Sequence, residues 1–444
     1  MKLRLLAAAL LCCTAFSGCV PMQTNVENLM QPPKLTALQY QVDTALREAV
    51  GRNFTLKYPR NGKYKSAFNF IDLSGDGIDE AIAFFATTED YIQVAVLTQT
   101  EGSWMVSDIL PGLSFCTEVD FVSFEKVGSA PRLMVGWGGT GIENNIMAIY
   151  GYTAADGEQP VLKLDSRWDY NRMTVTDIDQ NGISELLLLV AANSYDLTSP
   201  MAQLVGETSE GVIDLLAETE LPRNIATFLS PVMGGIGNNL YGATLDCVLN
   251  NGNLCTVTLA LQDGQLVMPL NDMDQNLFRK TIRTQYVVSS DINNDGIVDI
   301  PVERPAKGYV KDSSEAIYFS EYSNIQADKL ATIQTAYVNH AKGYRFLFPD
   351  SWTDQPVSAQ VQPDGTEVIF FLNPKDDLYD HSMELVRIKV YSTQDGQDLL
   401  DGNRYFQLAA KGTYLYCAAL PSVPVEELAL TKGQVGKLFS LVTG

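Results

Sequence analysis

From about residue 66 to about residue 332, short apolar runs alternate with clusters of Gly, Asn and Asp that recur every ten or so residues. The pattern is clearest where the region begins, and there it predicts four strands, at 67–72, 80–85, 91–99 and 104–109. Short apolar runs bounded by turn residues are typical of strands in an all-β protein. We therefore expect this region to be mainly β.

A helical periodicity precedes the β-rich region. Apolar residues recur there three or four positions apart, at Leu35, Leu38, Val42, Leu46 and Val50. Gly51 follows the last of them, and glycine is a common residue just after the end of a helix. Residues 35–65 are therefore expected to hold a helix and then a lead-in strand at 54–58.

Three segments of the β-rich region repeat one pattern of oxygen-bearing residues. They lie at 72–80, 177–185 and 291–299, and they start 105 and 114 residues apart. Between them lie two stretches, at 118–136 and 226–249, that have the strand pattern without the motif. Interleaving the five stretches gives a repeat of about 50 residues with four strands in each unit.

One four-stranded sheet per repeat, stacked radially, is the β-propeller arrangement, which leaves only short, protected sheet edges. We therefore expect a β-propeller over residues 66–332, with five countable blades and a total of five to seven. Either the strand at 54–58 or the C-terminal region would complete the ring.

The pattern changes after residue 340. Strands are expected at 367–372 and 383–391, with helices around 399–408 and 425–441. Strands followed by a terminal helix indicate a small α+β module over residues 340–444. The run Tyr-Arg-Phe-Leu-Phe-Pro-Asp-Ser-Trp at 344–352 resembles the opening of PsbP-like domains over about ten residues.

The N-terminus combines a basic start with an apolar run at 5–16 that is too short to span a bilayer, as in an export signal. The run ends in Phe-Ser-Gly-Cys, which resembles the lipobox of bacterial lipoproteins, with Cys19 at the position that receives the lipid. This resemblance implies a signal peptide at 1–18 and a lipid anchor on Cys19. Residues 19–34 would be a tether, and the chain would sit on the extracytoplasmic face of the cell membrane.

The formal net charge of −22 argues against nucleic acid as a partner, because such binders need a basic surface. Some of the acidity is expected to bind cations. In each repeated segment, oxygen-bearing side chains occupy positions one, three and five, glycine occupies position six, and a carboxylate occupies position nine. A tight turn of this kind can supply the six to eight oxygens that calcium requires, including a backbone carbonyl at position seven.

The glycines that permit the sharp turn are Gly77, Gly182 and Gly296. An EF-hand carries a bidentate glutamate at position twelve, but these positions hold Ala83, Leu188 and Val302. The predicted flanking elements are also strands instead of helices. Both differences disfavour calcium sensing by a helix-loop-helix unit.

Taken with their spacing, the loops resemble the FG-GAP and VCBS calcium-loop repeats of integrin-type β-propellers. The Phe-Gly and Gly-Ala-Pro flanks that name the family are absent. The resemblance implies a structural Ca²⁺ in alternate blades. The residues to which this role carries over are Asp72, Ser74, Asp76 and Glu80; Asp177, Asp179, Asn181 and Glu185; and Asp291, Asn293, Asp295 and Asp299.

Two further features leave alternatives open. Trp137 stands in a glycine-rich run at 136–141, which is expected to be an inter-strand turn at the propeller rim together with a related run at 234–237. An exposed tryptophan there is a candidate contact for a sugar or a peptide. Cys247 and Cys255 flank a hairpin-turn signal, which is compatible with a cross-strand disulfide and equally with two small apolar strand residues.

The usual parts of an active site are scarce. The chain has two histidines, His340 and His381, and neither lies in a His-Glu-x-x-His motif. There is no Gly-x-Ser-x-Gly elbow. Two functions therefore stay open. The first is a lipid-anchored binding or adhesion protein for a protein or carbohydrate ligand. The second is a cell-envelope hydrolase or assembly factor that uses carboxylates at the propeller centre.

Overall fold

The computed structural model describes residues 35–87, 91–124, 130–139, 144–153, 161–192, 198–271, 277–393 and 404–442. Within these ranges the chain is mainly β and forms antiparallel sheets, several of them four-stranded. The prediction of a mainly β protein with four-stranded units is confirmed at this level. The segments predicted to be a signal peptide and a tether, with Cys19 between them, lie outside the described residues.

Helix α3 (Ala37–Val50) precedes the first sheet, where the apolar periodicity predicts it. Thr36 and Gln39 form a capping box at its N-terminus, and Gly51 follows its C-terminus with a φ of 90°. The buried side of the helix, including Val42 and Leu46, packs on the first sheet. None of the helices in the described ranges is both long enough and apolar enough to cross a membrane.

The first sheet contains β1 (Thr55–Leu56), β2 (Phe68–Ile71), β3 (Glu80–Ala86), β4 (Gln93–Thr100) and β5 (Ser103–Pro111). Strand β1 pairs with the end of β3, at Ala86 and Phe85, while β2 pairs with its beginning. The strand predicted at 54–58 is therefore β1, which pairs with β3 of its own sheet next to β2. The expectation that it closes a ring is wrong.

Two four-stranded meanders follow. One consists of β6 (Phe115–Val122), β7 (Arg132–Gly138), β8 (Asn145–Thr153) and β9 (Val161–Tyr170). The other consists of β10 (Arg172–Thr176), β11 (Glu185–Val190), β12 (Met201–Glu207) and β13 (Ile213–Glu220). In each, every strand pairs antiparallel with the next one along the chain.

A ten-stranded sheet then joins the last two expected units. Its strands are β14 (Ile225–Phe228), β15 (Val232–Gly237), β16 (Leu240–Leu249), β17 (Leu254–Gln262), β18 (Gln265–Val267), β19 (Ile300–Pro305), β20 (Tyr318–Gln326), β21 (Lys329–Asn339), β22 (Tyr344–Leu347) and β28 (Phe439–Leu441). A parallel contact between Gly237 of β15 and Ile325 of β20 connects its two halves. The 3₁₀-helix η1 (Leu277–Thr281) lies between them along the chain.

The last sheet contains β23 (Val357–Val361), β24 (Glu367–Leu372), β25 (Glu384–Ser392), β27 (Tyr414–Ala419) and β26 (Phe406–Lys411). Beside it lie η2 (Asp350–Trp352), η3 (Glu426–Leu428) and helix α5 (Lys432–Leu438). Because β22 and β28 belong to the ten-stranded sheet, one sheet spans the expected boundary near residue 340.

Two helix predictions in this region need correction. Residues 406–408 belong to strand β26, and residues 399–403 lie outside the described ranges. The apolar residues of this stretch serve cross-strand pairing with β27 instead of a helix face. Over 425–441 the helix is only α5, between η3 and β28.

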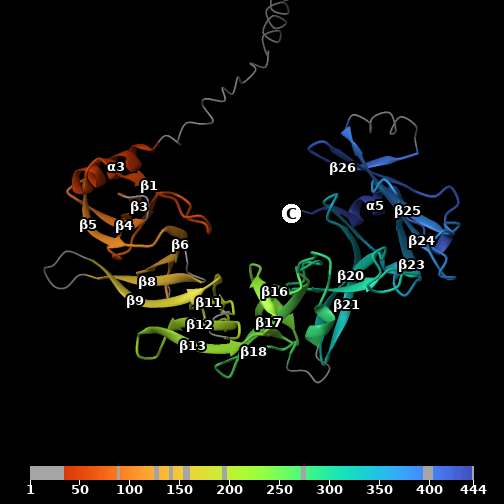
Figure 1. The fold of residues 1–444 in the computed structure, drawn as a ribbon, viewed down its shortest axis with the longest axis horizontal. Helices are drawn as coiled ribbons and strands as arrows, with labels where there is room; N and C mark the ends of the chain where they lie inside the picture. The colour runs from red at the N-terminus through yellow and green to blue at the C-terminus, as the bar shows by residue number, and fades with distance from the viewer. Residues whose placement is uncertain are drawn as a thin grey trace, which may run out of the picture.

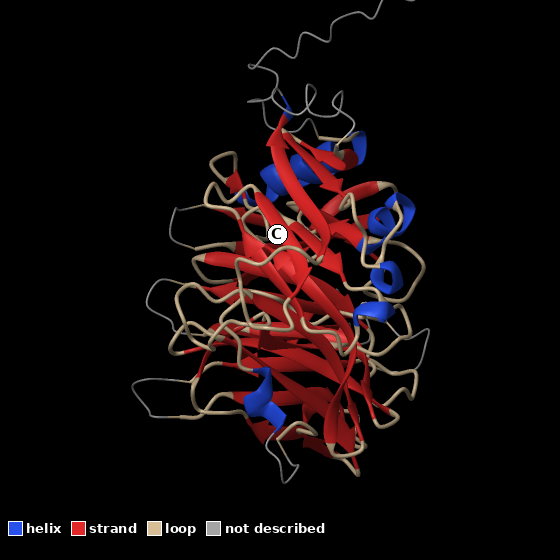
Figure 2. Cartoon of the chain, turned by 90° about the vertical axis from the view of Figure 1, so that its right-hand side faces the viewer, coloured by secondary structure: helices blue, strands red, loops and turns tan. Residues whose placement is uncertain are grey.

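Successive sheets pack face to face. Side chains of a strand point alternately to opposite faces, so one strand can serve two cores. In β11, Leu186 and Leu188 pack against the preceding sheet, whereas Leu187 and Leu189 pack against the following one. Figure 1 shows the sheets following one another around an arc, and Figure 2 shows the few helices at the margins of the strand layers.

The arc is not closed by strand pairing. Among the described strands, none in the first sheet pairs with one in the last sheet. The two sheets lie on opposite sides of the opening in Figure 1.

A buried ion pair holds the segment that precedes β19. The guanidinium of Arg283 donates from Nη2 to Oδ1 of Asp246 at 2.7 Å, and both side chains are almost fully buried. The Nε of Arg283 donates to the carbonyl of Val287, while the N–H of Ser289 donates to Asp246. The network fixes residues 287–289, which have no regular strand of their own.

We expect Arg283→Met to lower the free energy of unfolding by about 3–5 kcal/mol, because it leaves the carboxylate of Asp246 buried without a counter-charge. The control is Lys63→Met, which removes the exposed partner of Asp120 and should cost less than about 1 kcal/mol. Urea denaturation of the two variants and the wild type measures both values. Equal losses would show that the buried pair contributes no more than a surface pair.

Candidate metal loops

The three repeated loops occupy equivalent places in their sheets. In each, the residue before position one pairs antiparallel with the residue at position nine, and these pairs are Ile71 with Glu80, Thr176 with Glu185, and Ser290 with Asp299. The first two loops join full strands, β2 to β3 and β10 to β11. The third follows an isolated bridge and leads to β19. The predicted repeat is therefore one structural unit at three positions.

The same hydrogen bonds recur in every loop. The carboxylate at position one accepts hydrogen bonds from the backbone N–H groups at positions five and six, and the three carboxylates belong to Asp72, Asp177 and Asp291. The side-chain oxygen at position five accepts a hydrogen bond from the N–H at position seven, and these residues are Asp76, Asn181 and Asp295. Side chains at positions one and five thus already face the inside of the turn.

Two positions in each loop have a left-handed backbone. Position six is glycine throughout, with φ values of 87°, 86° and 85° at Gly77, Gly182 and Gly296. A Cβ atom there would meet nothing within 4 Å, so the backbone conformation and not the available space requires glycine. Position four is also left-handed, at Gly75, Gln180 and Asn294. The sequence analysis missed this second turn position, although glycine and asparagine there are the signal for it.

The carboxylate at position nine is the buried member of each loop. Glu80, Glu185 and Asp299 are 5%, 4% and 0% exposed. Each accepts a hydrogen bond from the backbone N–H at position two, at 2.8, 2.9 and 3.1 Å respectively. This bond ties the end of the loop to its beginning.

Burial raises the pKa of all three position-nine carboxyl groups. The pKa of Glu185 rises to about 7 because of burial, with a further contribution from the charges of Asp179 and Asp177. The pKa of Asp299 rises to about 6, again because of burial and then of Asp295 and Asp291. Among the described residues, no cationic side chain forms an ion pair with any of these three carboxylates, so each loop concentrates negative charge.

The carboxylate at position one of the first loop, Asp72, behaves differently. Partial burial opposes ionisation of Asp72, but hydrogen bonds from the N–H groups of Gly77, Gly75 and Asp76 outweigh it and lower its pKa. Asp72 is thus held as an anion at neutral pH. The first loop therefore holds one carboxylate whose anion is stabilised, Asp72, and one whose anion is disfavoured by burial, Glu80. A bound cation would stabilise the second anion.

The loops contain oxygen atoms that could bind a hard cation such as Ca²⁺. In the second loop, ligand atoms of Asp177, Asp179 and Glu185 all lie within 4.8 Å of one another, and no other group of three in the described ranges does so. In the third loop, Oδ1 of the fully buried Asp299 has no hydrogen-bond partner. Oxygen-only donor sets of this kind suit Ca²⁺ better than the nitrogen- and sulfur-seeking transition metals.

Position three differs among the loops. In the second loop Asp179 accepts a hydrogen bond from Nδ2 of Asn181 at 2.8 Å, and in the third loop Asn293 donates to Asp295 at 2.9 Å. Ser74 in the first loop brings no charge, and its hydroxyl lies 3.4 Å from Oδ1 of Asp72. Each loop thus has three carboxylates among its four assigned positions, and within the described ranges only those of the second loop converge within 4.8 Å.

The described parts of the two glycine runs, at 136–139 and 234–237, lie in or directly after strands β7 and β15. Trp137 lies in strand β7, is only 4% exposed and packs in the core between the first two sheets, so its prediction as an exposed ligand contact is wrong. The run at 234–237 lies in β15, where Gly235 exchanges hydrogen bonds with Gly296 and Val298 of the third loop. These glycines allow two backbones to approach closely. Glycine within a strand-forming stretch is a sequence signal for such a contact.

Cys247 and Cys255 lie directly opposite each other on β16 and β17. Both are buried free thiols. A hydrogen bond with Cys255, together with burial, raises the pKa of the Cys247 thiol well above its ordinary value. The two residues serve here as small apolar strand residues, one of the two alternatives that the sequence leaves open.

Comparisons with known proteins add no family. No family model matches the chain, and no curated protein matches it. A structure of BBS1N in complex with ARL6DN is 11% identical, with a TM-score of 0.27, and the match covers 84% of this chain and 99% of that one. A rhamnogalacturonan lyase from Bacillus licheniformis is 10% identical, with a TM-score of 0.30 and coverage of 86% and 87%. Likenesses this distant carry no argument about fold or function.

The raised pKa values predict how stability changes with pH when a chelator removes divalent cations. Glu185 binds a proton in the folded chain below a pH of about 7, whereas an unfolded glutamate does so only near its ordinary value of 4.5. Between these values the folded state binds more protons, so this group makes the protein more stable as the pH falls from 8 to 5.5.

The measurement is the free energy of unfolding in chelator for the wild type minus that of Glu185→Gln, determined at several pH values between 8 and 5.5. The difference should rise as the pH falls, since the variant has no group to protonate. A difference that stays constant, or that falls with pH, would contradict the raised pKa.

Proposed function

We propose that this chain is a lipid-anchored, extracytoplasmic binding protein whose sheets form a β-propeller-like scaffold stapled by structural Ca²⁺ ions. The observation that carries the proposal is the buried, unneutralised carboxylate at position nine, repeated in the same hydrogen-bonded turn three times. A divalent cation at each turn would neutralise this charge and use the lone pairs that face inward.

The scaffold part of the proposal is supported by the succession of sheets around an arc, two of which are four-stranded antiparallel meanders (Figure 1). Each of the two four-stranded meanders buries both faces against its neighbours, as propeller blades do. The first two loops lie between the first and second strands of their units, and the third lies between the bridge residue Ser290 and β19, so each ion would connect the two paired ends of its loop. In this arrangement the ion is structural and takes no part in a reaction.

The binding role follows from what a rigid scaffold of this kind offers. Loops and strand edges on a fixed array of sheets can hold a ligand without the cost of ordering a flexible surface. The lipobox-like sequence around Cys19 would place this scaffold outside the cytoplasm, where calcium is plentiful enough for weak sites to be filled.

We expect Ca²⁺ to raise the melting temperature of the full chain in detergent. A site that binds only the folded state adds about 2.7 kcal/mol when the free ion is at 100 times its Kd. Mg²⁺ at the same concentration should stabilise less, because it needs near-ideal octahedral geometry and loses its waters reluctantly. Differential scanning calorimetry with chelator, Mg²⁺ and Ca²⁺ measures these effects.

Matched variants locate the effect. Glu185→Gln keeps the size and an acceptor for the N–H of Ile178 but loses the charge, so it should remove part of the calcium-induced shift. The triple variant Glu80→Gln, Glu185→Gln, Asp299→Asn should remove it all. Glu210→Gln, in an exposed turn, should leave the shift unchanged. Identical melting of the wild type in chelator and in Ca²⁺ would overturn the proposal.

The anchor has its own test. A bacterium that expresses the full chain and is fed labelled palmitate should incorporate label into the wild type, and the protein should partition into detergent. Cys19→Ser should lose both properties, because the thioether forms on the sulfur of Cys19. Label on the serine variant would show that Cys19 is not the lipidated residue.

A further inference from the structure

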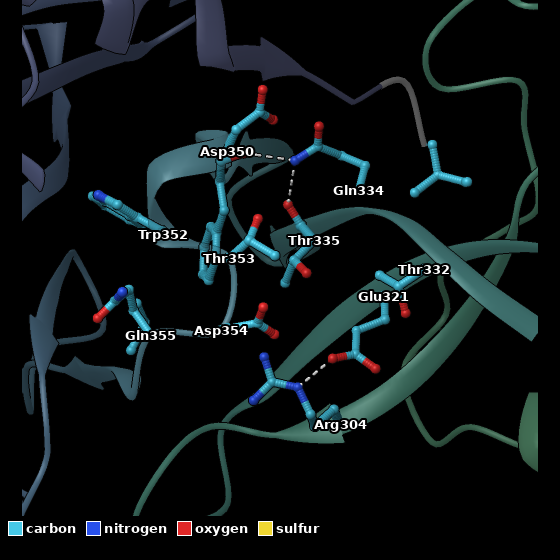
Figure 3. Close-up of a pocket in the computed structure, with 13 residues that line it drawn as sticks. Arg304, Glu321, Thr332, Gln334, Thr335, Asp350, Trp352, Thr353, Asp354 and Gln355 are labelled. Carbon is cyan, nitrogen blue, oxygen red and sulfur yellow. Dashed lines mark hydrogen bonds and ion pairs between the residues drawn. The ribbon is translucent and has the colours of Figure 1, made fainter.

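A polar cavity lies between the ten-stranded sheet and the segment that leads into the last sheet. Its volume is about 330 Å³, and it is lined by residues of β19, β20, β21 and η2 and of the turn after η2. This volume is at the lower end of the range for small-ligand sites. Figure 3 shows Arg304, Glu321 and Asp354 at one end of the cavity and Asp350 and Gln334 at the other.

The cavity lies along an edge of β21. Four consecutive residues of the strand, at 332–335, line it. Because neighbouring side chains of a strand point to opposite faces, a cavity that touches four in a row cannot lie on one face alone and must follow the strand edge.

This stretch of edge has no partner strand. Strand β20 pairs with one side of β21 at Lys329–Ala336, but β22 pairs with the other side only at Ala336–Asn339. The last contact is the N–H of Phe348, which donates to the carbonyl of Thr335 at 2.8 Å. The chain then turns away into η2. Among the described strands, none pairs with residues 329–334 on this side, which leaves backbone donors and acceptors for an added strand.

The charge of the cavity is negative. Its charged residues are Glu321, Asp350, Asp354 and Arg304. Arg304 is already engaged, since it pairs with Glu321 and lies over the ring of Phe319, 5.6 Å from its centroid. Across the described ranges, neither Asp350 nor Asp354 has an ion-pair partner or a donor to its carboxylate. Two carboxylates therefore remain for a cation that comes from outside.

The shape of the cavity selects the kind of cation. The carboxylates do not converge within 4.8 Å as those of the second loop do, which disfavours one small metal ion shared by all three. The aromatic residues that line the cavity, Trp352 and Phe348, are 2% and 5% exposed and offer no open face on which a sugar ring could stack. A long organic cation fits the remaining space and charge.

We propose that an extended peptide segment adds to the free edge of β21 and places a lysine or arginine side chain in this cavity. Main-chain hydrogen bonds to residues 329–334 would supply strand addition, and Asp350 and Asp354 would select the cation. The inference rests on the proposed binding role and names the class of partner. It does not depend on the metal loops.

The test uses fluorescein-labelled heptapeptides of alternating threonine and valine with lysine, arginine, norleucine or glutamate at the centre. Fluorescence anisotropy with the full chain in detergent measures each Kd. The lysine and arginine peptides should bind at least about tenfold more tightly than the norleucine peptide, and the glutamate peptide should bind least. The variant Asp350→Asn, Asp354→Asn should bind the lysine and norleucine peptides alike.

Two controls separate charge from strand addition. The variant Glu101→Gln, Glu210→Gln removes two exposed carboxylates outside the cavity and should bind like the wild type. Lysine peptides that are N-methylated at alternate amides form two series, and only one series should lose binding, because every second N–H of an added strand faces the β21 edge.

Equal Kd values for the lysine, norleucine and glutamate peptides, or no binding below about 1 mM, would overturn the cationic site. Unchanged binding of both N-methylated series would overturn strand addition. Calcium-dependent melting is measured without peptide. A negative peptide result therefore leaves the calcium proposal standing, and a negative calcium result leaves the peptide result to be judged alone.

Discussion

The burial of both faces of each inner sheet is the constraint on which the rest of this structure depends. A single four-stranded meander has two apolar faces and cannot be stable alone, so each one packs between its neighbours. The four consecutive leucines of β11 make this plain, since two enter the preceding core and two enter the following one. This packing fixes the spacing of the sheets, and with it the places where the connecting loops emerge.

The metal loops follow from this packing. Position nine of each loop is also the first residue of a buried strand or the partner in a bridge, so its carboxylate cannot reach bulk water. The backbone N–H at position two satisfies part of its hydrogen-bonding capacity, but the charge stays uncompensated and its pKa rises. A carboxylate in such a place is costly for the apo fold and well placed for a cation. The packing of the sheets therefore determines the electrostatics of the loops.

The same rules explain the free edge at β21. Where the chain leaves β22 for η2, the ten-stranded sheet loses its outer strand over half the length of β21. Other described edges end in short strands such as β18, or in longer strands with exposed charged residues such as β13 and β9. Here the edge has unpaired backbone groups and borders a cavity with two carboxylates, Asp350 and Asp354. The backbone groups can pair with an added strand, and the carboxylates favour a cation.

The amino-acid sequence by itself determined the local features. Apolar spacing located α3, β2 to β5 and some later strands such as β24 and β25, and the recurring Asp, Asn and Gly pattern located three loops whose hydrogen bonds are the same. These features depend on contacts within about ten residues, so the local sequence predicts them. Tertiary structure decided the rest. Trp137 is buried because Gly112 and the neighbouring sheet cover it, and β26 is a strand because β27 pairs with it. The opening of the arc, the merging of two units into one sheet and the cavity beside β21 all arise from pairings between residues far apart in the chain, which no local periodicity encodes.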